Sequence, residues 1–105
     1  MQGLMMRYPL TLEKILLRAR DVHSREEIVS RLADEKSEHR YTYGDFYRRV
    51  LRLMHALRKL GVQPGDRIAS FAWNHYRHME LYFAAPCVGA VVHTLNIRLT
   101  PDQLA

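Results

Sequence analysis

The sequence predicts an α/β fold: an incomplete layer made of an N-terminal helix and β-hairpin, a long amphipathic helix and a parallel strand–helix–strand unit. Three observations support this class. Apolar residues spaced three or four apart over residues 46–60 indicate a long helix. Two extended runs on either side of a charged turn indicate a hairpin. Two apolar strands near residues 67–73 and 90–95 are separated by a crossover long enough to make them parallel.

The first expected elements are a short helix over residues 11–22 and a hairpin after it. The apolar positions of this helix share one face: Leu12, Ile15, Leu16 and Ala19. Ile28 and Val29 mark the first strand within "EEIVSRL", and "HRYTY" supplies the second. The polar turn around "ADEKSE" joins the two runs, so we expect them to pair as a β-hairpin.

A long amphipathic helix is the clearest element of the sequence. Thr42 suits its N-cap, and Asp45 stands at the third helical position, where it completes a capping-box pattern. Its apolar positions are Phe46, Tyr47, Val50, Leu51, Met54, Leu57 and Leu60, and the opposite face carries Arg48, Arg52, His55 and Lys59. Gly61 supplies the left-handed residue that commonly ends a helix.

A tight turn leads into the predicted strand–helix–strand unit. In "VQPGD", Pro64 and Gly65 suit the two central positions of a type II turn. "RIASFAW" reads as a strand that ends at Trp73, and Asn74 can cap the following helix. Pro86 should kink or end that helix, after which "AVVHTL" forms the next strand. Both strands are nearly continuously apolar, as expected where helices cover both faces of a sheet.

The sequence closes on "RLTPDQLA", which has the signals of a helix start: Thr100 as N-cap, Pro101 at the first position and Gln103 as capping-box partner. So short a helix cannot recover its nucleation cost alone. Two parallel strands would also leave open edges. We therefore expect this chain to be the front of a longer protein, with residues 1–10 as an N-terminal extension and residues 11–105 as part of one domain.

Composition narrows the class of protein. The net charge of +5 and the pI near 9.7 raise the question of nucleic-acid binding. The basic residues are dispersed on helix faces without interleaved aromatic residues, so we expect no nucleic-acid partner. The longest apolar stretch, residues 81–92, is too short to span a membrane, and no signal peptide is visible. The single cysteine, Cys87, fits a reducing compartment, and we expect a cytoplasmic protein.

The residues that could carry chemistry give no catalytic or metal site. His75 and His78 have a spacing that a metal can use, but the H-E-x-x-H arrangement is missing, so exposed helix histidines are expected. Cys87 lies in an apolar context that suits a buried structural thiol. The position of a dinucleotide-binding glycine loop holds Trp73, Asn74 and His75, which argues against such a site.

One positional argument predicts a binding site. Ligands of open α/β sheets gather outside the carboxyl ends of the parallel strands. The residues there, and hence the candidate substrate-binding residues, are Trp73, Asn74, His93, Thr94 and Asn96. A competing interpretation makes Asn74 only a helix cap and His93 an ordinary strand residue.

The ordered series of these features resembles the N-terminal portion of adenylate-forming acyl-CoA synthetases of the AMP-binding superfamily. It is most similar to the medium- and long-chain fatty-acid CoA ligases of bacteria. The residues that carry the resemblance are the Thr42-Tyr43 helix entry, "LRKLGVQPGDRIA", Asn74 and "YFAAPCVGAVVHTLN". Ile97 departs from the pattern, because many relatives have proline there.

The resemblance implies an ATP-dependent ligase that joins a fatty acid to ATP with Mg²⁺, releases pyrophosphate, and passes the acyl group to coenzyme A. The family's phosphate loop, nucleotide-binding aspartate and catalytic lysine match no positions of this chain, so the chain alone should be inactive scaffold. The resemblance also implies a homodimer through the N-terminal segment, in which Arg18, Arg20, Arg25 and Arg31 could pair across the contact. The alternatives are a stand-alone dimerisation module without activity and a small basic nucleic-acid binder.

Overall fold

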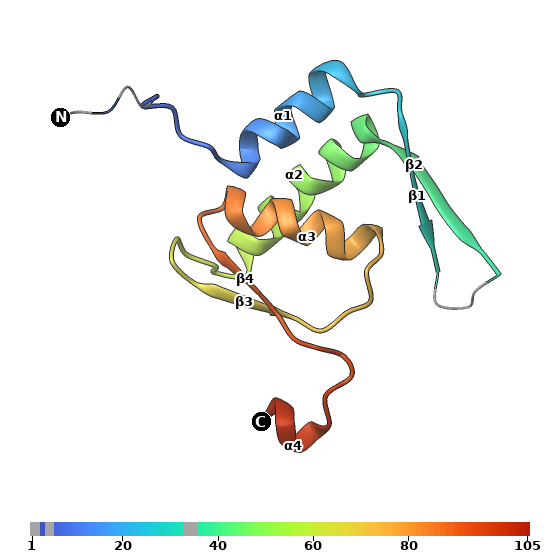
Figure 1. Ribbon diagram of the computed structural model, residues 1–105, viewed down its shortest axis with the longest axis vertical. Helices are drawn as coiled ribbons and strands as arrows, with labels where there is room; N and C mark the ends of the chain where they lie inside the picture. Colours follow the sequence, from blue (N-terminus) through green and yellow to red (C-terminus); the bar gives the residue numbers. More distant parts are fainter. Residues whose placement is uncertain (1–2, 4–5, 33–35) are drawn as a thin grey trace.

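The computed structural model describes residues 3, 6–32 and 36–105 (Figure 1). Part of the N-terminal extension and residues 33–35 of the expected charged turn lie outside this description. The elements in chain order are α1 (Leu12–Val22), β1 (Glu27–Arg31), β2 (Glu38–Thr42), α2 (Tyr43–Lys59), β3 (Arg67–Ser70), α3 (Tyr76–Cys87), β4 (Val91–Thr94) and α4 (Pro101–Leu104). This order confirms the expected α/β class and the order of its elements.

The hairpin leads directly into the long helix. β1 and β2 pair antiparallel, with Glu27 opposite Thr42 and Ile28 opposite Tyr41. Thr42 ends β2 and caps α2: its Oγ1 accepts a hydrogen bond from the Asp45 backbone N–H at 3.1 Å, and the Asp45 carboxylate accepts one from the Thr42 N–H at 3.2 Å. The predicted capping box is therefore confirmed, and it satisfies two backbone N–H groups where β2 passes into α2.

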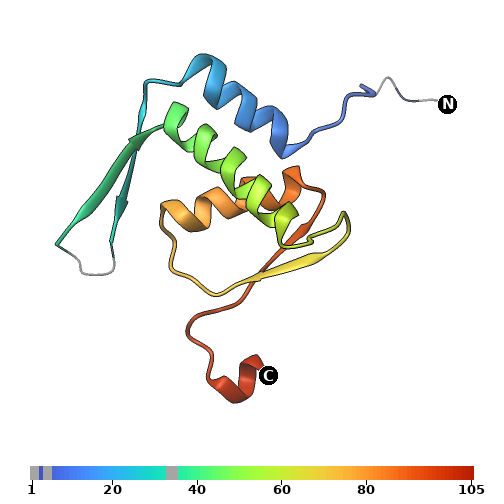
Figure 2. The ribbon, with the colours of Figure 1, turned by 180° about the vertical axis from the view of Figure 1, so that it is seen from behind.

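The core lies where α1, α2 and α3 pack against one another. Figures 1 and 2 show α2 between the other two helices, with the hairpin at one end and β3 and β4 on the far side of α3. Phe46 and Val50 of α2 are fully buried, and Leu16 of α1 and Ala84 and Ala85 of α3 pack in the same cluster. The small alanine side chains allow the helices to approach closely at this point.

Not every residue of the predicted apolar faces is buried. Ile15 of α1 and Leu51 of α2 stay exposed, and Leu60, which caps the C-terminus of α2, is 81% exposed. The helical spacing of apolar residues predicts which face of a helix is apolar. Only the part of that face that a neighbouring helix covers is buried from water. The apolar faces are thus wider than the core that they form.

β3 and β4 pair in parallel, as predicted, with Arg67 opposite Val91 and Ser70 opposite Thr94. The turn before β3 has the predicted form: Gly65 has a φ of +91°, and the Asp66 N–H donates to the Gln63 carbonyl at 3.1 Å. The Gly65 N–H donates to the Gly89 carbonyl at 2.8 Å, so the turns that precede the two strands are bonded together.

Two predicted boundaries around residue 73 were wrong. β3 ends at Ser70 rather than Trp73, because its last hydrogen bond to the β4 segment runs from the Leu95 N–H to the Ser70 carbonyl. α3 is capped by His75 rather than Asn74, since His75 Nδ1 accepts from the His78 N–H at 3.3 Å. Residues 71–75 therefore form a connecting loop. Pro86 does mark the end of α3, which stops one residue later.

The C-terminal turn also follows its signals. α4 begins at Pro101 after Thr100, whose N–H donates to the Gln103 side chain at 3.1 Å. The chain as a whole has a radius of gyration of 16.4 Å, whereas about 13 Å is usual for this length, so it is less compact than an ordinary domain. No helix in the described part of the chain is long and apolar enough to cross a membrane.

Candidate functional site

A hollow of about 290 Å³, called here the first hollow, opens at the carboxyl ends of β3 and β4. Trp73 and Asn74 reach it from loop 71–75, and Thr94 and Asn96 reach it from the end of β4. His78 and Tyr82 of α3 and Arg98 also line it. Four of the five predicted site residues are thus brought together, because parallel strands present their carboxyl ends at one edge.

The fifth predicted residue, His93, does not line the first hollow. It is exposed on β4, where successive side chains point to opposite faces of the sheet. Thr94 faces the hollow, so its neighbour His93 faces away from it. Position at a strand end does not by itself decide which face a side chain takes.

A second hollow of about 310 Å³ lies on the other side of the α3 N-terminus, against strand β1. Ile28, Val29 and Ser30 of β1 line it. Asn74, His78 and Tyr82 line both hollows, so the start of α3 separates two open spaces. The residues of this helix turn are consequently the ones that shape both of them.

His78 is buried rather than exposed, which corrects the sequence-based expectation for this residue. Its exposed fraction is 7%, and its Nε2 lies 3.0 Å from the Oγ of Ser70, which is also 7% exposed. The other ring nitrogen, Nδ1, is buried and has no hydrogen-bond partner among the residues that the structure describes. Among the described residues no carboxylate is bonded to this imidazole, so the Ser70–His78 pair lacks the third member of a catalytic triad.

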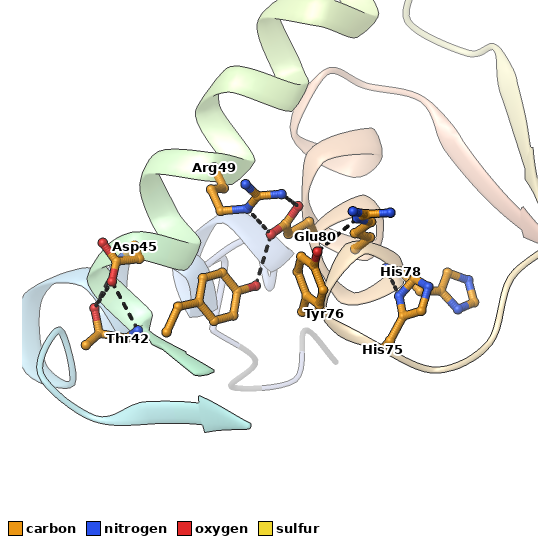
Figure 3. Close-up of polar contacts among 9 residues, drawn as sticks. Thr42, Asp45, Arg49, His75, Tyr76, His78 and Glu80 are labelled. Atoms are coloured by element: carbon orange, nitrogen blue, oxygen red, sulfur yellow. Dashed lines mark hydrogen bonds and ion pairs between the residues drawn. The ribbon is translucent and has the colours of Figure 1, made fainter. Parts of the chain in front are cut away.

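A buried carboxylate joins the hairpin to the helices (Figure 3). Glu80 of α3 is 4% exposed and pairs with Arg49 of α2, with Nε–Oε1 at 2.6 Å and Nη2–Oε2 at 3.3 Å. The Tyr41 hydroxyl of β2 donates to the same carboxylate at 3.0 Å. Burial, followed by the charge of Glu80, raises the pKa of Tyr41 well above 10. The hydroxyl therefore keeps its proton and remains a donor.

Sequence reasoning missed this network and the burial of His78. The available signal was the surrounding sequence: Glu80 and His78 stand in "HMELYFAAPCV", a helical run that is otherwise mostly apolar. A helix that is apolar on most of its surface is buried on most of its surface. Its polar residues are then buried as well and need partners.

The expected absence of a metal site can be compared with the described residues. Among those residues, no three His, Cys, Asp or Glu side chains lie close enough to hold a metal ion. Cys87 is half-buried, and burial raises the pKa of its thiol. A raised thiol pKa lowers the thiolate fraction, so Cys87 suits a structural role better than a nucleophilic one.

The fold agrees with what comparison with known proteins shows. A family model described as "AMP-binding enzyme" matches residues 18–105, and the chain belongs to this family. The sequence is 50% identical over 101 residues to the long-chain-fatty-acid–CoA ligase of Thermus thermophilus, a match that covers 96% of this chain and 18% of that protein.

Other similar proteins are also CoA ligases. The chain is 42% identical to a 3-methylmercaptopropionyl-CoA ligase of Ruegeria lacuscaerulensis, over 99% of this chain and 19% of that protein. Among solved structures, the N-terminal domain of FACL13 from Mycobacterium tuberculosis superimposes with a TM-score of 0.78 at 24% identity, over 90% of this chain and 23% of that one. That likeness shows the fold. The chain spans about a fifth of the length of the curated relatives it matches.

Proposed function

We propose that this chain is part of an ATP-dependent fatty-acid CoA ligase. The reaction joins a fatty acid and ATP into an acyl-adenylate with release of pyrophosphate, and coenzyme A then displaces AMP to give acyl-CoA. The observation that supports this most is the 50% identity to a long-chain-fatty-acid–CoA ligase over nearly the whole chain. A medium-chain-fatty-acid–CoA ligase of Ectopseudomonas oleovorans is 36% identical. ATP, Mg²⁺ and coenzyme A are the co-reactants of this proposal.

Within this enzyme, the chain supplies scaffold and one edge of a binding site. The first hollow lies outside the carboxyl ends of a parallel pair, which is where open α/β sheets bind ligands. We propose that Trp73, Asn74, Thr94 and Asn96 contact a substrate there. No catalytic role is assigned to a residue of this chain, and we propose a cytoplasmic location because ATP and coenzyme A are available there.

A chimera tests the function. The matched 101 residues of the Thermus thermophilus ligase are replaced by this chain, and pyrophosphate release is measured with fatty acid, ATP, Mg²⁺ and coenzyme A. We expect fatty-acid-dependent release from the chimera and none from the 105-residue chain alone. The variant Trp73→Ala should lower kcat/KM, whereas Leu60→Ala, at an exposed helix end, should not. A folded but inactive chimera, or activity of the chain alone, would contradict the proposal.

We also propose that the protein forms a homodimer through the segment from Thr11 to Tyr41. The outer face of α1 offers exposed apolar residues, among them Ile15 and Val22, next to arginines such as Arg18. The test is sedimentation of the chimera: Ile15→Asp should weaken association, and Leu60→Asp, on a different surface, should not. A stand-alone dimerisation module is the alternative function, and it would give dimers together with an inactive chimera.

A further inference from the structure

His78 bonds to both ends of the loop that carries two of the candidate site residues. Loop 71–75 begins after Ser70, whose Oγ lies 3.0 Å from His78 Nε2. The loop ends at His75, whose Nδ1 accepts from the His78 backbone N–H at 3.3 Å (Figure 3). A single helical residue therefore contacts the side chain just before the five-residue loop and the side chain of the loop's last residue.

Burying the His78 imidazole costs free energy that an apolar side chain of similar size at this position would not cost. Within the described part of the chain His78 Nδ1 has no hydrogen-bond partner, and a buried polar atom without a partner costs free energy. An apolar side chain could fill the same space beside Tyr82, whose ring centroid lies 4.8 Å from that of His78. The hydrogen bond between Nε2 and the Ser70 hydroxyl is what an apolar residue could not supply. The position therefore favours an interaction with the start of the loop.

We propose that His78 is a positioning residue that sets the geometry of Trp73 and Asn74 in the first hollow. Between Ser70 and His75 the chain is neither strand nor helix, so ordinary backbone ladders do not order it. The two bonds to His78 order it from outside and limit how far Trp73, which is 63% exposed, can move. The effect on catalysis rests on the proposed function, whereas the effect on the loop does not.

The experiment uses Ser70→Ala, which removes one bond and leaves the α3 cap intact, and Ser70→Thr, which keeps the hydroxyl. Ser30→Ala is the matched control, because Ser30 is a comparably buried serine that lies on β1. Trp73 is the only tryptophan of the chain, so its fluorescence anisotropy reports the mobility of this loop directly. Helical content is measured on the same samples by circular dichroism.

We expect lower anisotropy in Ser70→Ala, and wild-type values in Ser70→Thr and Ser30→Ala, at equal helical content. In the active chimera, Ser70→Ala should raise the KM of at least one substrate about tenfold and change kcat by less than about twofold, as when binding alone is weakened. Ser70→Thr should restore KM.

Three results would overturn the proposal: unchanged anisotropy in Ser70→Ala, loss of helical content in that variant alone, or a mobile loop with unchanged KM in an active chimera. A chimera that is inactive with the wild-type chain would contradict the proposed function instead. The anisotropy measurement would still decide whether His78 orders the loop.

Discussion

At the scale of single residues, hydrogen bonds between buried polar groups attach the hairpin to the helices. Glu80 accepts bonds from Arg49 of α2 and Tyr41 of β2, so one carboxylate connects three elements. A buried charge is tolerated only when it is paired and hydrogen-bonded. Each of its partners is therefore expected to matter more than an exposed residue of the same type.

Replacing Glu80 with glutamine should lower the free energy of unfolding by about 1–3 kcal/mol, because the buried bonds to Arg49 lose their charge. The Arg49 side chain is 42% exposed and can be hydrated, which keeps the loss below that of a fully buried pair. Glu38→Gln is the control, since Glu38 pairs with Arg40 at 2.7 Å on the surface and should contribute less than about 1 kcal/mol. Urea unfolding measures both, and equal effects would contradict the argument.

Asp45 should make stability depend on pH in the acid range. Its hydrogen bond with Arg48, together with those from Thr42, lowers its pKa below the ordinary value of 3.8. A carboxylate whose pKa is depressed in the folded state stabilises the protein above the unfolded pKa, and loses this effect as the pH falls through the folded pKa.

The comparison for Asp45 is thermal unfolding of the wild type and Asp45→Asn over a series of pH values. The wild type should melt higher above pH 3.8, and the difference should shrink as the pH falls below that value. A difference that does not change with pH would show that the carboxylate charge contributes nothing to the cap.

At the scale of elements, the predictions that succeeded depend on neighbouring residues. The capping box of Thr42 and Asp45 and the turn at Gly65 use residues within three positions of one another, so the sequence contains everything needed to read them. The end of β3 depends on where β4 stops pairing, more than twenty residues away. The cap of α3 depends on which of two adjacent side chains reaches the helix, and neither follows from local pattern.

The same division applies to the candidate site. The strand-end rule found Trp73, Asn74, Thr94 and Asn96 because parallel topology alone brings these segments together. It did not exclude His93, since the face of a strand residue depends on the register of the whole strand. The burial of His78 depends on how α3 packs against its neighbours, and its interaction with Ser70 is therefore visible only in the structure.

Two glycines in the turns before β3 and β4 give a matched pair of predictions. Gly65 and Gly89 both have positive φ, so alanine at either position should cost about 1–2 kcal/mol in backbone strain. A Cβ on Gly65 would meet nothing within 4 Å, whereas a Cβ on Gly89 would lie 3.1 Å from Pro64 Cβ and 3.3 Å from its backbone Cα. Gly89→Ala should therefore destabilise more than Gly65→Ala, as measured by the urea midpoint. The reverse order would refute the close approach.

At the scale of the whole molecule, the chain leaves several large apolar side chains exposed outside its core. Phe71, Trp73 and Val91 are each at least half exposed around the β3–β4 pair, and the chain is extended for its length. Large exposed apolar patches on a protein usually mark a surface that contacts something else. The similar proteins are much longer, since this chain covers only about a fifth of their length. In those proteins, other segments are available to contact such a surface.

The 105-residue chain alone should therefore bind a dye such as anilinonaphthalene sulfonate and enhance its fluorescence, whereas the chimera should bind much less. The physical reason is that, in the chimera, the remainder of the Thermus thermophilus ligase can cover the surfaces around β3 and β4. Lysine at Val91 should reduce dye binding by the isolated chain more than lysine at Leu60, which lies at the exposed end of α2. Equal dye binding by the chain and the chimera would show that the rest of the chimera does not cover the surfaces around β3 and β4.

The bond between the turns at Gly65 and Gly89 has a consequence for the order of folding. Pairing two parallel strands is slow when their ends must first meet by chance over a long loop. In the folded chain the Gly65 N–H donates to the Gly89 carbonyl, and the Val91 N–H donates to the Asp66 carbonyl as the first rung of the strand pair. We therefore expect the strand pair to form from this end first. Substitutions at Gly89, before the first rung, should then slow refolding more than substitutions at Thr94, at the last rung.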